Sequence, residues 1–296
     1  MQTYLDCLAC FMSQIVRVGQ LLELPERDCL NMLCEFSADL AEIELADPPP
    51  KTSIRLYQMI SRYVGSPDPF AAIKRESTEK ALALYPRLQK RVAAAPDPLS
   101  LAAKFAVAGN VIDFGVASQF DLAQELDRVL DHGAFGHWQE ELFRAALEKA
   151  EWLLYLGDNT GETVMDRLFI ETIVRETATP VKYVVREAPI INDATFADAL
   201  AAGLDACATI ISSGCSAPGT VLELCSPEFL ELFHQAPLII SKGQGNYETL
   251  SGVSAPLFFF LKAKCRVVAD HLGVELGDLN LVRGEPARNT EKLASR

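Results

Sequence analysis

Through the first half of the chain, hydrophobic residues recur every three or four positions. Two such series open it: Leu5, Leu8, Phe11, Met12, Ile15 and Val18, then Leu30, Leu33, Phe36 and Leu40. This spacing is typical of amphipathic helices. Proline-rich stretches at 47–50, 65–69 and 95–98 end them, a buried helix follows from Leu99, and another amphipathic helix is expected over 138–150. Residues 1–150 are therefore predicted to form a helical N-terminal domain.

After residue 150 the pattern changes to short apolar or β-branched runs. Five of them lie at 151–157, 181–187, 207–213, 236–242 and 258–265, and segments of helical length separate them. Strands that alternate with helices indicate βαβ units and a parallel sheet. We therefore expect an α/β protein, in which the helical domain packs on a three-layer α/β/α core with a mostly parallel sheet over residues 151–296.

Polar residues concentrate directly after the predicted strands. The first strand is followed by Gly157-Asp158-Asn159, the second by Asn192 and Asp193, the third by Ser213 and Gly214, and the fourth, ending at Lys242, by Gly243 and Asn246. Ligands of an open parallel sheet bind at this carboxyl edge. Asp158, Asn159 and Asp193 offer the oxygen donors that Mg²⁺ or Mn²⁺ prefers. Lys242, Asn246 and the glycine-rich backbone offer donors that suit a phosphate.

A simpler interpretation treats the acidic residues as helix caps. Asp158 and the 192–195 segment fit N-caps, and Glu162 and Asp166 fit the polar start of a helix. Other ligand signatures are missing: the chain has no P-loop, no GxGxxG after the first strand and no GxSxG elbow. The joint occurrence of the acidic loops with KGQGNYE at 242–248 is what favours a metal-assisted phosphoryl site over two isolated caps.

Composition limits the partners. The formal net charge is −13 and the pI is about 4.8, which argues against binding of nucleic acid or an anionic membrane. No uncharged run approaches the length of a membrane span. Eight cysteines in 296 residues are too few for a disulfide scaffold, so we expect a reducing, cytoplasmic location. The oligomeric state is left open.

The cysteines leave one question open. Cys7, Cys10, Cys29 and Cys34 lie close together in the sequence, and Cys265 could complete a site with the first pair. Zinc, an iron–sulfur cluster or a redox pair would each use such thiols. Buried core thiols are the alternative, because the second half of a CxxC…CxxC signature is missing.

Together, these segments resemble a known family. GDNTGE with a downstream Asp, PIINDAT, KGQGNYE, LKAKC and AGNVIDFG at 108–115 occur in the order found in the damage-control phosphatase family, long catalogued as domain of unknown function 89. LKAKC and the N-terminal Cys-x-x-Cys are similar to its prokaryotic subgroup. The resemblance implies a helical segment on an α/β/α core, one divalent metal (Mn²⁺, Mg²⁺, Co²⁺ or Ni²⁺) and hydrolysis of small phosphate monoesters, such as sugar phosphates or damaged phosphometabolites.

The resemblance also assigns residues. The family's metal ligands fall on Asp158, Asn159 and Asp193, its substrate-binding stretch on Lys242 to Glu248, and its sheet-end lysine on Lys262. Better-studied branches have an Asp-Leu pair and an Arg where Gln244, Gly245 and Glu248 stand here, which leaves the identity of the small phosphorylated substrate open. One branch has been credited with carboxyl methyltransferase activity, but this chain has no S-adenosylmethionine glycine motif.

A mechanism follows from these assignments. Asp158, Asp193 and Lys242 are the predicted catalytic residues, with Asp158 acting as a base or, as the second choice, a covalent nucleophile. The predicted substrate-binding residues are Asn110, Glu162, Ser213, Gly214, Lys242, Gly243, Asn246 and Lys262, and Asp113 would help Asn110 to close the site. The rival hypothesis is a protein that binds a metal or metabolite without catalysis, and methyl transfer ranks below it.

Overall fold

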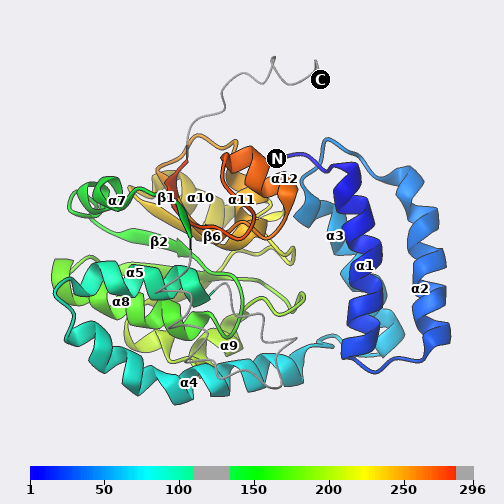
Figure 1. The fold of residues 1–296 in the computed structure, drawn as a ribbon, viewed down its shortest axis with the longest axis horizontal. Coiled ribbons are helices and arrows are strands. Elements are labelled where there is room, and N and C mark those ends of the chain that lie inside the picture. The colour runs from blue at the N-terminus through cyan, green and yellow to red at the C-terminus, as the bar shows by residue number, and fades with distance from the viewer. Residues whose placement is uncertain (110–133, 285–296) are drawn as a thin grey trace.

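The structure is a computed structural model that describes residues 1–109 and 134–284 (Figure 1). Asn110 and Asp113 lie outside these ranges. The helices of the first part are α1 (Leu5–Leu21), α2 (Glu26–Asp39), α3 (Pro49–Val64), α4 (Ala71–Ala93) and α5 (Pro98–Gly109). The three predicted proline stretches lie at the start of α3, between α3 and α4 and between α4 and α5, since proline suits the first turn of a helix and disfavours its interior; Pro86 nevertheless lies inside α4.

The second part alternates strands and helices. The strands are β1 (Phe135–Trp138), β2 (Leu153–Leu156), β3 (Val181–Val185), β4 (Thr209–Ser212), β5 (Ile239–Lys242), β6 (Leu257–Lys262) and β7 (Leu279–Arg283). The helices are α7 (Glu140–Leu147), α8 (Thr163–Thr177), α9 (Phe196–Ala201), α10 (Pro227–Gln235), α11 (Gly243–Leu250) and α12 (Arg266–Leu272). All five predicted strands are present.

The strands form one sheet in the order β1-β7-β6-β5-β2-β3-β4. The five predicted strands are neighbours and run parallel, whereas β7 runs antiparallel to β6 and carries β1 alongside it. The mostly parallel sheet of the predicted fold is thus confirmed. β1 was not predicted, since helices alone were expected before residue 150.

Alternate residues of the strands build two cores, one on each face of the sheet. Tyr155 and Tyr183 face the layer that contains α4, α5 and α8, whereas Leu154, Leu156 and Val184 face the layer of α10 to α12. Figure 1 shows these layers below and above the sheet. Helices α4 and α5, which the hydrophobic pattern places in the N-terminal domain, therefore share the main core with the sheet.

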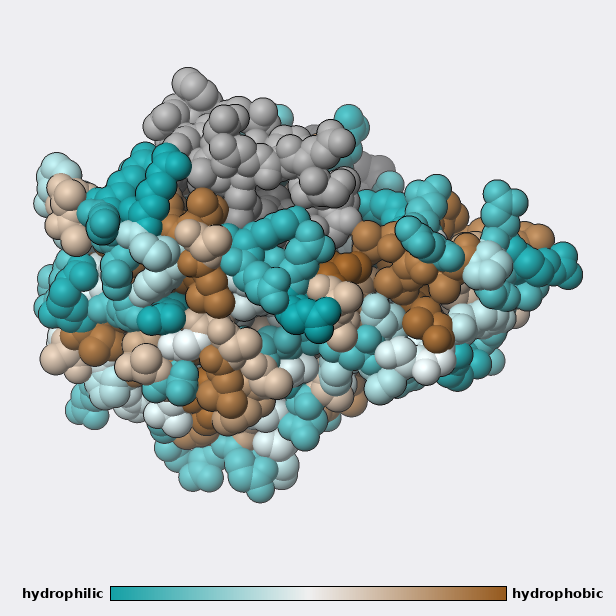
Figure 2. Space-filling view, turned by 90° about the horizontal axis from the view of Figure 1, so that it is seen from below, coloured by the Kyte–Doolittle hydropathy of each residue, from teal (hydrophilic) through white to brown (hydrophobic). Residues whose placement is uncertain are grey.

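Helices α1 to α3 stand to one side and have their own core (Figure 1). Phe11, Ile15, Phe36 and Ile60 are among its buried members, and Ile190, from the loop after β3, joins them. A space-filling view from below shows hydrophobic residues in patches on this side of the molecule and also on the opposite half (Figure 2). Within residues 1–109 and 134–284, no helix is both long and apolar enough to cross a membrane.

Candidate active site

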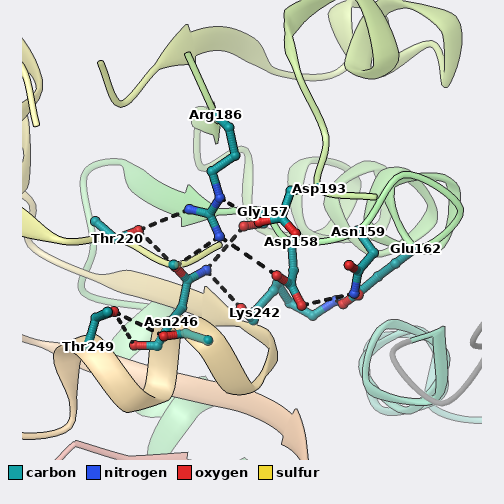
Figure 3. Close-up of polar contacts among 12 residues, drawn as sticks. Gly157, Asp158, Asn159, Glu162, Arg186, Asp193, Thr220, Lys242, Asn246 and Thr249 are labelled. Carbon is teal, nitrogen blue, oxygen red and sulfur yellow. Dashed lines mark hydrogen bonds and ion pairs between the residues drawn. The ribbon is translucent and has the colours of Figure 1, made fainter. Parts of the chain in front are cut away.

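The loops after β2 and β3 are hydrogen-bonded to each other. The Thr160 amide donates to the Asn192 carbonyl over 2.9 Å, and the Ala194 amide donates to the Asp158 carbonyl over 2.8 Å. This short antiparallel bridge places Asp158 and Asn159 beside Asp193. The three predicted metal ligands therefore lie together, at the carboxyl edge where parallel strands present their loops (Figure 3).

Arg186 lies at the centre of this group and was not predicted. Its Nε donates to Asp193 Oδ2 over 2.7 Å, and its Nη2 lies 3.7 Å from Asp158 Oδ1. The same guanidinium reaches Asn246 Oδ1 at 3.3 Å and Thr220 Oγ1 at 3.4 Å, and Thr220 donates to Asn246 over 2.8 Å (Figure 3). One buried arginine thus links the segments that follow β2, β3, β4 and β5. Its position as the first residue after β3 was the available sequence signal.

Lys242 is fully buried and contacts carboxylates of this chain. Its Nζ donates to Asp166 Oδ1 over 2.5 Å and to the Ala106 carbonyl over 2.8 Å, and it forms an ion pair with Glu162. Asp166 also accepts hydrogen bonds from the hydroxyls of Tyr155 (2.6 Å) and Tyr183 (2.9 Å). Lys242 was expected to neutralise phosphate, but its ammonium has three partners within the protein. Asp166 is a central member of this network rather than only a polar start of α8.

Gly243 and Asn246 position the start of α11 against Asp158. Gly243 has a φ of +79°, and a Cβ at this position would lie 1.8 Å from Asp158 Oδ2. Asn246 donates to the Lys242 carbonyl over 2.8 Å and to the Gly157 carbonyl over 3.1 Å. Only glycine allows this approach, because any side chain would occupy the place of the carboxylate.

Among the described residues, the buried carboxylates of the site outnumber the buried cations that pair with them. Four carboxylates, those of Asp158, Glu162, Asp166 and Asp193, face two cations, Arg186 and Lys242. Burial, and then the charges of Asp193 and Glu162, raises the pKa of Asp158 to about 8. Burial raises the pKa of Asp166 to about 6 and also raises that of Asp193, against the opposing effect of the nearby cations. The site therefore favours either bound protons or an additional cation.

The donor set fits a hard divalent cation. The Asp158 and Asp193 carboxylates carry the negative charge and both lie beside Arg186, and the Asn159 side chain lies against Asp158, to which its Nδ2 donates over 3.0 Å. Thr160 Oγ1, one residue from Asn159, is buried without a hydrogen-bond partner. This hydroxyl oxygen is therefore available to bind a ligand. Across residues 1–109 and 134–284, no three His, Cys, Asp or Glu side chains are arranged to hold a metal, so the candidate ligand set consists of only two carboxylates and the Asn159 amide. All eight cysteines are free thiols, and the zinc, iron–sulfur and redox alternatives for them remain untested.

The other predicted substrate-binding residues lie further from Asp158 and Asp193, or outside the residues that the structure describes. Ser213 and Gly214 follow β4, where the Ser213 amide donates to the Val185 carbonyl and Gly214 packs on Ser226. From this loop it is Thr220 that reaches Arg186. Lys262 ends β6 opposite Leu279, at the same edge of the sheet. The substrate-binding roles of Ser213, Gly214, Lys262 and Asn110 remain predictions.

The comparisons with known proteins agree on the family. The sequence model of the damage-control phosphatase ARMT1-like domain matches residues 3–279. The chain belongs to this family. A damage-control phosphatase of Pyrococcus horikoshii, PH1575, is 35% identical over 290 residues, which cover 96% of this chain and 99% of the relative. A damage-control phosphatase of Archaeoglobus fulgidus is 29% identical over 281 residues, or 92% of this chain and 96% of the relative.

A solved structure shows the same fold. The crystal structure of a DUF89 family protein from P. horikoshii superposes with a TM-score of 0.87 at 34% identity, and it covers 96% of this chain and 100% of that one. The resemblance inferred from the sequence motifs is thus confirmed. Family membership supports a phosphatase role, and hence a hydrolase, with small phosphorylated metabolites as the class of substrate.

Proposed function

We propose that the protein is a metal-dependent phosphatase that hydrolyses small phosphate monoesters. The observation that carries the proposal is that Asp158, Asn159 and Asp193 lie together at a place where, among the described residues, buried carboxylates outnumber buried cations. Such a site has the charge deficit that one Mn²⁺, Mg²⁺, Co²⁺ or Ni²⁺ ion would offset. Membership of the family supports the reaction class, and the carboxylates of Asp158 and Asp193 are the reason for proposing that the reaction depends on a metal.

Asp158, Asn159 and Asp193 would hold the cation, which when bound neutralises phosphoryl charge and makes the phosphorus more electrophilic. Arg186 fixes the orientation of Asp193 and lies close enough to Asp158 to keep both carboxylates in place. Asp158 takes a proton from the attacking water.

The phosphoryl oxygens require hydrogen-bond donors that are not already bonded to other groups of the protein. The backbone amides at the start of α11, from Gly243 onward, point out of a helix N-terminus beside Asp158. Lys264 is exposed, and its charge acts on the Asp158 carboxyl and lowers its pKa against the effect of burial. We assign Lys264 and these amides to the phosphate. Lys242 holds Glu162 and Asp166 in place beneath the site.

The test is phosphate release by protein stripped of metal with EDTA. We expect turnover of p-nitrophenyl phosphate only after Mn²⁺ is restored, and no turnover in Asp158→Ala or Asp193→Ala. Asp205→Ala removes an exposed carboxylate far from these contacts in the sequence and is the matched control, expected to behave as wild type. Circular dichroism shows whether each variant is folded. Full activity in EDTA would contradict the proposal, and tight Mn²⁺ binding without turnover would favour the non-catalytic alternative.

A further inference from the structure

Lys74, one turn into α4, is a buried cation that the proposed mechanism does not use. Its side chain is 2% exposed, and its ammonium pairs with Asp68 Oδ2 at 3.0 Å and with Asp198 Oδ2 at 2.7 Å. Burial of a lysine is rare and costs desolvation, and the start of a helix is the positive end of its dipole. Two carboxylates offset these costs, but buried ion pairs add little net stability over apolar packing. Stability alone therefore does not account for an ammonium at this position.

The two partners of Lys74 differ in the segments to which they belong. Asp68 lies in the connection between α3 and α4, where it accepts from the Phe70 amide over 3.2 Å. Asp198 belongs to α9 and completes the capping box of that helix. Its Oδ2 accepts from the Thr195 amide over 2.9 Å and from the Thr195 hydroxyl over 2.6 Å. One carboxylate oxygen of Asp198 therefore binds both the start of α9 and the ammonium from α4.

Thr195 is two residues from Asp193, and the backbone between them is bonded to the rest of the candidate site. The Ala194 amide donates to the Asp158 carbonyl over 2.8 Å, and the Ala194 carbonyl accepts from the Arg186 amide over 2.9 Å. Arg186 and Thr195 also form an isolated parallel bridge. A continuous series of hydrogen bonds and one ion pair therefore connects the turn of Asp193 with α4.

Helix α4 is a firm support for this turn. Leu88 and Val92 of α4 belong to the main core that the sheet shares with α8, and α4 contacts both α8 and α9. Burial raises the pKa of Asp193, whereas the charges of Arg186 and then of Lys74 lower it, so Lys74 also acts on this carboxyl through space. The hydrogen bonds fix the backbone of the turn, and the ammonium favours the ionised carboxylate.

We propose that Lys74 is a positioning residue, which acts on Asp193 through the capping box of α9 and thereby sets the affinity of the candidate site for a divalent cation. This inference rests on the proposed function, because it concerns the same metal. Metal affinity then depends on a side chain of α4, a helix that itself supplies no ligand. Removing an outer partner of a metal ligand typically changes metal affinity or activity by roughly 10–100-fold.

Asp198→Ala and Asp68→Ala are a matched pair, because each removes one carboxylate partner of Lys74 and one acceptor of a backbone amide. Only Asp198 is joined to the turn of Asp193. We expect Asp198→Ala and Lys74→Met to bind Mn²⁺ roughly 10–100-fold more weakly than wild type, and Asp68→Ala to bind it as wild type does. The double variant of Lys74→Met and Asp198→Ala should bind Mn²⁺ no more weakly than the weaker single variant, since both changes remove the same link. Circular dichroism shows which variants are folded.

Hydrogen exchange of the Ala194 amide follows the same link in protein without metal. This amide donates to the Asp158 carbonyl, and it should exchange at least tenfold faster in Asp198→Ala and Lys74→Met than in wild type or Asp68→Ala. The expected Mn²⁺ affinities and exchange rates, found in a protein that releases no phosphate from any monoester, would refute the phosphatase and leave the inference standing. Wild-type Mn²⁺ affinity in folded Asp198→Ala and Lys74→Met, or equal losses in Asp198→Ala and Asp68→Ala, would overturn the inference.

Discussion

Replacing Gly243 by alanine tests whether catalysis depends on the position of the Asp158 carboxylate. The added Cβ would lie 1.8 Å from Asp158 Oδ2 and 2.4 Å from its Cγ, whereas real Cβ contacts stay beyond 3.0 Å. The carboxylate cannot turn away freely, because it accepts from Asn159 Nδ2 at 3.0 Å and lies beside Arg186. Asp158 must therefore shift by roughly 1 Å, a displacement that can cost on the order of 100-fold in rate.

The same substitution also has a backbone cost that must be separated from the displacement. An alanine held at a φ of +79° lowers the free energy of unfolding of the protein by roughly 1–2 kcal/mol. Gly273 offers a matched control, since its φ is +72° and nothing lies within 4 Å of its added Cβ. We expect Gly273→Ala to lose this backbone energy alone, with wild-type activity. Gly243→Ala should lose more stability than the control, and also the activity.

The assay compares the two variants and wild type for phosphate release with saturating Mn²⁺, for Mn²⁺ affinity and for the urea midpoint of unfolding. The expected result is a kcat/KM at least 100-fold lower in Gly243→Ala, with weaker Mn²⁺ binding. If Gly243→Ala kept its activity within threefold and bound Mn²⁺ as tightly as Gly273→Ala does, the assigned role of Asp158 would be refuted.

Three further predictions follow from the buried charges. Lys242→Met leaves Glu162 and Asp166 without their cation and should cost about 3–5 kcal/mol of unfolding free energy in urea; a loss below 1 kcal/mol would contradict the network. Arg186→Lys keeps the charge but not the planar fork, so kcat/KM should fall roughly 10–100-fold, and unchanged kinetics would exclude a positioning role. The Asp158 pKa, raised from 3.8 to about 8, means that only the folded state retains this proton, so stability in EDTA should fall as pH rises from 5 to 8. Stability that rises over this range in urea titrations would contradict that protonation state.

The five central strands could be predicted because each is a short apolar or β-branched run between helical segments. β1 could not, because Phe135-Gly136-His137-Trp138 is only four residues long and contains a glycine, which weakens the strand signal. β7 pairs antiparallel with β6, and nothing in the sequence of the connection between them indicates that the two strands are partners. Local patterns therefore predict the five parallel strands that alternate with helices, and tertiary pairing determines β1 and β7.

At the site, the ligands could be predicted from the rule that loops meet at the carboxyl edge of a parallel sheet. The side of the sheet to which the Lys242 side chain points could also have been predicted. Ile240 faces the layer of α5 and α8, and strand residues two apart share a face, so Lys242 points toward Asp166. The partners of Arg186 were not predictable, because Thr220 and Asn246 are brought to it only by the packing of distant loops.

The most direct test measures Mn²⁺ binding and phosphate release in the same preparations of wild type and Asp193→Ala. We predict that wild type binds one Mn²⁺ per chain and releases phosphate from p-nitrophenyl phosphate only when it is bound. Asp193→Ala should remain folded and lose both properties together. Phosphate release by Asp193→Ala at the wild-type rate, or by wild type with no bound metal, would contradict the metal-dependent mechanism.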